Sequence, residues 1–353
     1  MKVLLLGLNH SSVINSLCLG FNKIGFDYRA LSFDSSRSEY INYDSIDCVF
    51  KDGVTRIEVL SGIVKLYKAV KEADIIHVYS NFSVPSRLNE VVSPFLYNQK
   101  GKRYFVTFTG NDIRDPKIEL DRNPFFKYTY FHPLYENREY ESSFNSFTRQ
   151  RFFSDKNFEV IANPETFPFI RHDLFRKVHL ANHPSWNSAN SIDLDSVQIP
   201  GSGSTIRVLH APSAYYSKGS NFVLDDFMKL EKKWGDKIEL KLLQKVSNEE
   251  YLEELSRADI LVDQLVWGWY GVAAQQAMQM GKVVLCYLSS DRIQFVPGLP
   301  IVNVNKFTLF DTLDNLIHDR ALLRELGDAS AEFYRNYHSP EVVAREVLTI
   351  YRS

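Results

Sequence analysis

The sequence has few cysteines, no long apolar run and almost no net charge. Three cysteines occur among 353 residues, and Cys18, Cys48 and Cys286 are far apart. Without paired metal-ligand spacing they indicate free thiols in a reducing compartment and no metal site. No stretch approaches the roughly 20 apolar residues that span a bilayer, and the amino-terminal run resembles a first buried strand, not a signal peptide. We therefore expect a cytoplasmic protein that at most attaches to the inner face of a membrane.

The charge balance and the absence of repeats further limit the possible partners and domain organisation. A formal net charge of -2 gives no whole-protein electrostatic reason to expect nucleic acid as a partner. Neither half of the chain recognisably repeats the other. Hydrophobic residues at 44% and a length of 353 residues predict two globular domains of roughly 150 to 200 residues each.

Short apolar runs alternate with helical segments, which is typical of βαβ units and predicts an α/β fold with parallel sheets. The expected strands lie at 2–6, 28–33, 75–78, 104–108, 158–162, 178–180, 206–210, 238–243, 260–263 and 283–287. A Ser- and Gly-rich stretch predicts a linker at 186–204 between an amino-terminal domain (1–185) and a carboxy-terminal domain (205–336). The last helix, about 337–353, is expected to pack back on the first domain. We expect two Rossmann-like domains whose strand ends face a shared cleft.

A segment dense in aromatic residues runs from Asp121 to Asn157. Aromatic stripes usually mark packing, so a pair of core helices covering the sheet is the favoured interpretation. An acceptor-binding or membrane-facing surface is the alternative.

Two motifs in the second half predict a site for an anion. In HAPSAYYSKGSNFV, from His210 to Val223, a strand leads into a turn with one lysine before a helix, where unpaired N–H groups and the Lys218 charge favour a diphosphate. Lys218 is expected to lie on the surface. In the stretch from Ala258 to Tyr287, Gly268 and Gly271 flank two aromatic residues ahead of a short helix, so a ligand could approach its first amides. Taken singly, each motif could be an ordinary turn.

Together these motifs resemble glycosyltransferase family 4, which has the GT-B fold and transfers sugars from nucleotide-sugars. The resemblance is strong from Ile206 to Ser353 and fainter before Asn182, where FTGNDIRDP (108–116) and LANHPSW (180–186) are similar to family segments. It implies that Lys218 binds the donor phosphates. It also implies that further residues of both lobes bind the donor, namely Gly7, Ser213, Gly268, Trp269, Tyr270, Gly271 and Gln276.

The sequence departs from the family at its charged positions. The family's two glutamates fall on Gly268 and Gln276, its arginine falls on Ser213, and its amino-terminal histidine falls on Thr109. Gln276 can still hydrogen-bond a hydroxyl group, and with Asp112 it is our candidate catalytic residue, although Asp112 is equally suited to cap a helix. Asp263 and Gln264 are further replacement candidates. Candidate acceptor-binding residues follow predicted strand ends or lie in the 108–116 loop: Asn9, His10, Asn81, Asn111 and Arg114.

The resemblance implies a retaining, metal-independent bacterial transferase that needs no cofactor beyond its co-substrate. The partners would be a nucleoside diphosphate sugar and a glycan or lipid-linked glycan acceptor, in polysaccharide biosynthesis. The substituted glutamates keep two alternatives open. One is a non-catalytic GT-B subunit that binds an active partner glycosyltransferase, and the other is a sugar-nucleotide epimerase.

Overall fold

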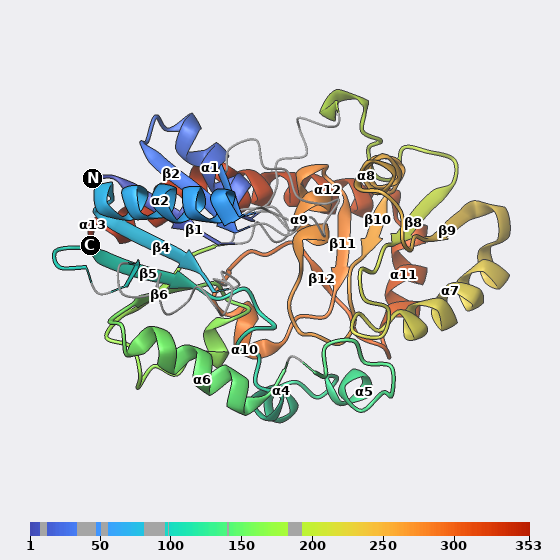
Figure 1. Cartoon of the computed structure of the whole chain (residues 1–353). Coiled ribbons are helices and arrows are strands. Elements are labelled where there is room, and N and C mark those ends of the chain that lie inside the picture. Colours follow the sequence, from blue (N-terminus) through green and yellow to red (C-terminus); the bar gives the residue numbers. More distant parts are fainter. Residues whose placement is uncertain are drawn as a thin grey trace. The chain divides into compact units, whose positions relative to one another are not determined.

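A computed structural model describes residues 1–7, 13–33, 47–50, 56–80, 96–97, 99–139, 141–182 and 193–353, with only the backbone at 47–50 and 56–59 (Figure 1). Contacts divide the chain into two compact units. The first contains Met1–Asp115, Tyr140–Trp186 and Ser339–Ser353, and the second contains Pro116–Glu139 and Asn187–His338.

The first unit is built on a seven-stranded parallel sheet in the order β3-β2-β1-β4-β5-β6-β7. Its strands are β1 (Val3–Leu6), β2 (Tyr28–Phe33), β3 (Asp47–Phe50), β4 (Ile75–Tyr79), β5 (Arg103–Thr107), β6 (Glu159–Ala162) and β7 (Val178–Leu180). Strands β1 and β4 are buried throughout their length, and His77 is the one polar exception in their largely apolar sequences, as expected for strands covered on both faces. The strands expected in this half are present, and β3 is an additional strand.

Helices flank this sheet, and the carboxy-terminal helix is one of them. The helices are α1 (Val13–Lys23), α2 (Arg56–Glu72), α6 (Ser143–Ser154), α13 (Pro340–Arg352) and the short η2 (Phe167–Phe169). α13 packs on α1 at Gly20, where a Cβ atom would lie 2.0 Å from the carbonyl oxygen of Pro340. At the other end of α13, the hydroxyl of Tyr351 lies 2.6 Å from Nδ1 of His77 in β4. Residues from the far end of the sequence thus complete the first core.

The second unit contains a five-stranded parallel sheet in the order β12-β11-β10-β8-β9. Its strands are β8 (Ile206–His210), β9 (Ile238–Leu242), β10 (Ile260–Val262), β11 (Val283–Cys286) and β12 (Val302–Asn303). Its helices are α4 (Pro116–Arg122), α5 (Lys127–Tyr130), α7 (Ser220–Trp234), α8 (Asn248–Arg257), α9 (Val272–Gln279), α10 (Ser290–Ile293), α11 (Leu309–His318) and α12 (Arg320–Phe333), with short turns η4 (Leu194–Ser196), η5 (Gly235–Lys237) and η6 (Tyr334–His338). The fold class expected from the sequence is confirmed.

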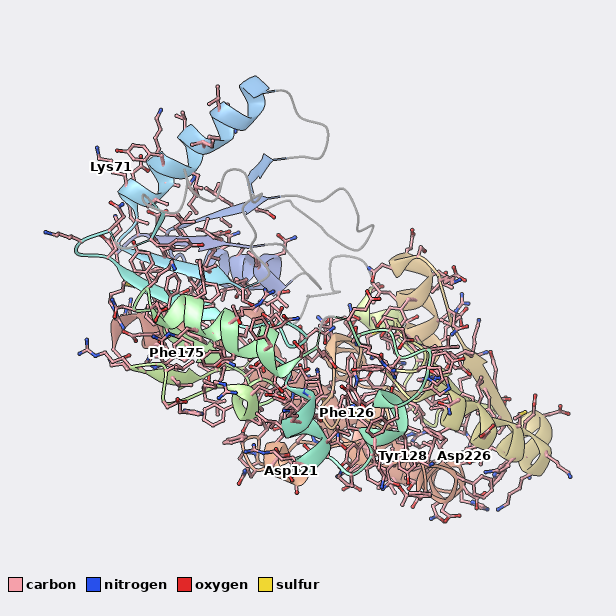
Figure 2. The ribbon with its side chains drawn as sticks, turned by 60° about the horizontal axis from the view of Figure 1, so that its bottom comes forward. Lys71, Asp121, Phe126, Tyr128, Phe175 and Asp226 are labelled. Atoms are coloured by element: carbon pink, nitrogen blue, oxygen red, sulfur yellow. The ribbon has the colours of Figure 1, made fainter. Side chains whose placement is uncertain are left out.

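The aromatic segment is divided between the units, which the sequence did not predict. Residues 116–139 lie in the second unit, although the expected first domain extended to residue 185. Phe126 and Tyr128, labelled in Figure 2, belong to this part. Phe126 is fully buried, whereas Phe131 is 68% exposed and Phe144, on α6, is 75% exposed. The segment therefore contains both core and surface aromatics, and the core interpretation holds for only some of them.

The described residues include two buried cysteines and no membrane-spanning helix. Cys18 and Cys286 are buried free thiols. Burial raises the pKa of Cys18 to about 12, so this thiol is a poor nucleophile. Among the residues that the structure describes, no helix has the length and apolar character needed to cross a membrane.

Candidate functional site

The candidate site lies at the carboxyl edge of the second unit's sheet, between β8 and β10. The chain leaves β8 for β9 on one side, and it leaves β10 for β11 on the other side. Such a divergence point is where open parallel sheets bind ligands, outside the carboxyl ends of the strands. Both motifs singled out in the sequence, the turn after β8 and the loop after β10, are at this position.

Lys218 is held at this point by a buried carboxylate. Its Nζ lies 2.5 Å from Oδ1 of Asp263, and Oδ2 of Asp263 accepts a hydrogen bond of 2.9 Å from the amide of Gly271. Lys218 is 8% exposed and Asp263 is 3% exposed, so the expectation of a surface lysine is wrong. One carboxylate thus joins the lysine of the first motif to the amide that begins helix α9.

The turn before α7 is also in contact with a carboxylate. Glu136, from the 116–139 segment, accepts hydrogen bonds from the amides of Tyr216 (2.9 Å) and Ser217 (3.0 Å) and from the Ser217 hydroxyl (2.6 Å). Gly219 follows with φ of 75° as the N-cap of α7, a conformation that favours glycine. Ser213, which occupies the family's arginine position, is exposed in the same loop.

The loop between β10 and α9 is organised by Gln264. Its Oε1 accepts hydrogen bonds from the amides of Val266 (3.0 Å) and Trp267 (2.6 Å), and its Nε2 donates to the carbonyl oxygens of Trp269 and Tyr287. Because Gln264 is 1% exposed and its amide is engaged on both sides, its contacts indicate a structural role. The hypothesis that it replaces a lost acid is not favoured by this arrangement.

Gly268 cannot accommodate a side chain in this loop. Its φ is 78°, and a Cβ atom would lie 2.8 Å from Nη1 of Arg292. Arg292 is 1% exposed and forms an ion pair with the equally buried Glu119, and its Nη1 donates to the carbonyl of Trp267 at 2.8 Å. Asn123 adds a 2.7 Å hydrogen bond to the carbonyl of Val266. A guanidinium group therefore lies next to the position where the family carries its first glutamate.

The other predicted donor-binding residues differ in how accessible they are. Trp269 and Tyr270 are 7% and 3% exposed within the core, and the Tyr270 hydroxyl lies 2.9 Å from Nε2 of His338. These contacts favour packing, and donor binding by either ring stays a prediction. Gln276 lies on α9 and is 5% exposed, as is Gln275. Within the described residues the Gln275 amide oxygen has no hydrogen-bond partner.

His210, the last residue of β8, connects this strand to β10 and to helix α7 through its two ring nitrogens. Its Nδ1 lies 2.7 Å from the carbonyl oxygen of Val262, and its Nε2 lies 2.8 Å from the hydroxyl of Ser220. Burial lowers the pKa of His210 from 6.5 to about 4. The imidazole is therefore neutral at pH 7 and contributes rigidity beneath the site.

This depressed pKa predicts acid sensitivity. As the pH falls from 6.5 towards 4, the unfolded chain binds a proton at His210 that the folded chain does not bind, so the free energy of unfolding should fall by about 3 kcal/mol. Urea unfolding followed by tryptophan fluorescence reports on this unit, which contains Trp234, Trp267 and Trp269. His210→Gln should reduce the pH slope, and His172→Gln, at an exposed position in the first unit, is the control for the loss of a histidine. Equal slopes in both variants would contradict this assignment.

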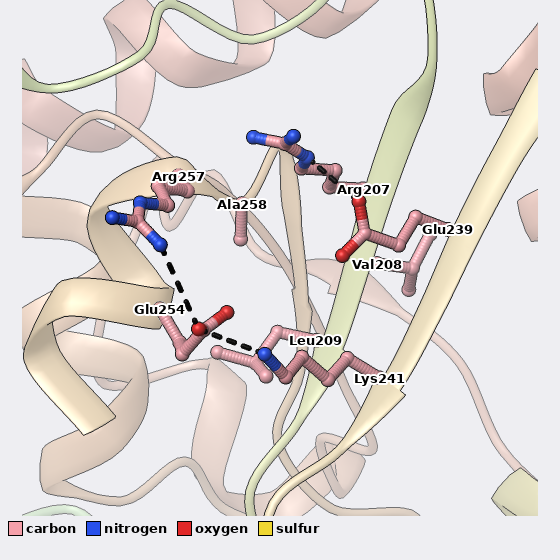
Figure 3. Close-up of a pocket in the computed structure, with 8 residues that line it drawn as sticks. All are labelled: Arg207, Val208, Leu209, Glu239, Lys241, Glu254, Arg257 and Ala258. Carbon is pink, nitrogen blue, oxygen red and sulfur yellow. Dashed lines mark hydrogen bonds and ion pairs between the residues drawn. The ribbon is translucent and has the colours of Figure 1, made fainter. Parts of the chain in front are cut away.

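A pocket of about 130 Å³ lies elsewhere in this unit, between β8, β9 and α8 (Figure 3). Its charged lining residues are already paired: Arg207 with Glu239 at 2.9 Å, and Lys241 with Glu254 at 2.8 Å. Arg257 also faces Glu254, at 3.9 Å. Arg257 also pairs with Glu253, outside the lining, at 2.5 Å. Each positive side chain of the lining thus already contacts a glutamate, which makes this pocket a weaker candidate for a phosphate ligand than the edge between β8 and β10.

The predicted residues of the first unit have mostly structural contacts. Asp112 is half-buried, and its two carboxylate oxygens accept hydrogen bonds from the amide of Thr109 at 3.0 and 3.1 Å. Burial raises the pKa of Asp112. Arg114 is 1% exposed and contacts Glu141 at 3.0 Å and Glu165 at 2.8 Å. Asp112 therefore stabilises the turn after Thr109 and does not cap a helix, because the next helix, α4, begins only at Pro116. Arg114 has an internal ion-pair role.

The other predicted residues of the first unit either lie close to the ends of its strands or lie outside the described part of the chain. Gly7 follows β1 and is buried, with its amide donating to the carbonyl of Leu31 at 3.3 Å. Asn111 is half-buried beside Asp112. Asn9, His10 and Asn81 lie outside the described residues. Acceptor binding by any of these residues stays a prediction.

The sequence did not single out Glu119, Glu136 or Arg292. Glu136 and Arg292 contact the loops of the site, and Glu119 pairs with Arg292. The two glutamates come from the 116–139 segment, more than 75 residues before the residues that they contact. The lone signal in the sequence is a high density of charged and aromatic residues, which does not indicate a contact partner. The roles of these three residues could therefore be identified only from the structure.

Comparisons with known proteins support the fold. No protein-family model and no curated protein matches the chain. Among solved structures, a sucrose-phosphate synthase from Thermosynechococcus elongatus matches with a TM-score of 0.60 and 14% identity, covering 100% of this chain and 98% of the other. HepE from Anabaena, solved in complex with UDP-glucose, matches with a TM-score of 0.60 and 12% identity over 100% and 99%.

A third match is a putative UDP-N-acetylglucosamine 2-epimerase from Listeria monocytogenes, with a TM-score of 0.51 and 12% identity over 99% of this chain and 94% of the other. At these identities the matches establish the fold and not the activity. The chain thus has the α/β fold of the GT-B glycosyltransferases, with two parallel sheets.

Proposed function

We propose that this chain transfers a sugar from a nucleoside diphosphate sugar to a glycan or lipid-linked glycan acceptor. The observation that carries this proposal is the placement of Lys218 at the divergence point of the second sheet, next to the amide that begins α9. An ammonium group has three donors, so Lys218 can keep Asp263 as a partner and still donate to a phosphate oxygen. Solved GT-B structures in complex with UDP-glucose and UDP support a nucleotide-sugar as co-substrate.

The remaining features of the proposal come from the resemblance to glycosyltransferase family 4. They are a retaining, metal-independent reaction, a bacterial cytoplasmic setting at the inner membrane face, and a role in polysaccharide biosynthesis. Asp112 is retained as a candidate catalytic residue in this proposal, although its contacts with the Thr109 amide stabilise a turn.

Gln276 is proposed to bind the ribose or the sugar of the donor. Its side chain is 5% exposed on α9, and an amide can both donate to and accept from hydroxyl groups. Gln276→Ala should therefore weaken binding of the intact nucleotide-sugar about 5- to 10-fold, the effect of one neutral hydrogen bond. Titration calorimetry measures this, with Gln294→Ala, at an exposed position, as the matched control. Unchanged affinity in Gln276→Ala would reject the assignment.

Two alternatives remain in the same fold. A non-catalytic subunit that binds a partner glycosyltransferase is consistent with the missing glutamates at Gly268 and Gln276. A sugar-nucleotide epimerase is weakly favoured by the structural match to a putative epimerase.

Incubating the purified chain with a panel of nucleotide-sugars, with and without acceptor extract, tests these functions. Nucleotide release that requires acceptor supports transfer. A changed sugar without acceptor indicates an epimerase, and neither product in any condition indicates the partner subunit.

A further inference from the structure

The turn that precedes α7 already binds a carboxylate supplied by the chain itself. Glu136 receives two amide hydrogen bonds and one hydroxyl hydrogen bond from Tyr216 and Ser217, at 2.6 to 3.0 Å. Within the described residues, no lysine or arginine forms an ion pair with Glu136. Backbone amides and a hydroxyl group are also the donors that hold phosphate oxygens in turns before helices.

We propose that Glu136 competes with the donor's phosphate groups for the Tyr216–Ser217 turn and so restrains nucleotide binding. This inference rests on the proposed function, because it takes the ligand of the turn to be a diphosphate. Glu136 is exposed, so an anion from solvent can reach the donors that it occupies. Binding then exchanges one anion for another at the same donors.

The turn does not need Glu136 to keep its shape. The amide of Gly219 donates to the carbonyl of Tyr216 at 3.1 Å, and the carbonyl of Lys218 accepts from the amide of Leu265 at 3.1 Å. Thr129 donates to the carbonyl of Tyr216 at 2.7 Å. These bonds remain when Glu136 is displaced, so removal of its charge should free the turn without unfolding it.

The segment that carries Glu136 is attached to the same turn by contacts that do not involve charge. The His132 ring stacks on Tyr216 with centroids 4.1 Å apart, and Asn137 donates to the Ser217 hydroxyl at 3.4 Å. The segment therefore holds the carboxylate close to the turn, which raises its effective concentration. A nucleotide-sugar must therefore displace the Glu136 carboxylate, which the chain itself holds at the turn.

Glu136→Gln tests this competition, with Glu139→Gln as the matched control. Glu139 is exposed and three residues away, so the control makes the same charge change. Calorimetric titration with inorganic pyrophosphate and with UDP, GDP and ADP should show affinity rising about 3- to 10-fold in Glu136→Gln and less than about twofold in Glu139→Gln, as expected when a competing charged group is removed. Equal affinities in the two variants, or weaker binding in Glu136→Gln, would overturn the proposal.

Pyrophosphate distinguishes this proposal from the proposed function. If Glu136→Gln binds pyrophosphate more tightly but no variant binds a nucleoside diphosphate, the competition stands and the donor assignment fails. If the wild-type chain binds a nucleoside diphosphate but Glu136→Gln changes neither affinity, the donor assignment stands and the competition fails.

Discussion

Replacing Lys218 with methionine should weaken nucleoside diphosphate binding about 10- to 100-fold, the effect of losing a charged hydrogen bond. It should also destabilise the second unit, because Asp263 would remain buried with the amide of Gly271 as its one remaining hydrogen-bond partner within the described residues. Removing one partner of a buried ion pair typically costs about 3 to 5 kcal/mol. Calorimetry measures the first effect, and urea unfolding followed by tryptophan fluorescence measures the second.

A double variant separates these two effects. In Lys218→Met with Asp263→Asn, the neutral amide can still accept from Gly271, so most of the lost stability should return while binding remains weak. Lys232→Met, at an exposed position on α7, controls for the loss of one positive charge. Affinity in the double variant equal to that of the wild type would show that Lys218 does not bind the donor.

Replacing Gly268 with glutamate, which restores the family residue, should damage the fold and restore no activity. The left-handed backbone at φ of 78° and a Cβ atom 2.8 Å from Nη1 of Arg292 leave no room for a side chain. Displacing Arg292 would also separate it from Glu119, where both side chains are at most 2% exposed. We expect a loss of about 3 to 5 kcal/mol for Gly268→Glu and about 1 to 3 kcal/mol for Gly268→Ala, measured by urea unfolding.

Gly298 provides the matched control for this strain. Its φ is 76°, but a Cβ atom there would meet nothing within 4 Å. Gly298→Ala therefore carries the same backbone cost without the contact to Arg292, and it should be less destabilising than Gly268→Ala. Equal losses would mean that the contact with Arg292 is unimportant.

The regular parts of the fold were predictable because their signal is local. Runs such as 206–210 and 283–287 are short and mostly apolar, and the structure places β8 and β11 there within one residue. The two strands that were missed, β3 and β12, are short edge strands with four and two residues. Such strands bury less apolar surface, so their pattern is weak.

The chemistry of the site was less predictable because it depends on contacts between distant residues. The sequence indicated Lys218 and the two glycines, since a turn before a helix has a local signature. It did not indicate that Asp263 binds Lys218 from 45 positions away, or that Glu119 pairs with Arg292 across 173 positions. Nothing in the spacing of these charges identifies a partner, and the strength of each pair depends on its burial and geometry in the folded chain.

A structure in complex with the nucleoside diphosphate that gives the largest thermal shift would show directly whether Lys218 binds the donor. We expect phosphate oxygens within hydrogen-bonding distance of Lys218 Nζ, at the carboxyl edge between β8 and β10. A diphosphate bound elsewhere, with Lys218 still contacting only Asp263, would contradict this expectation.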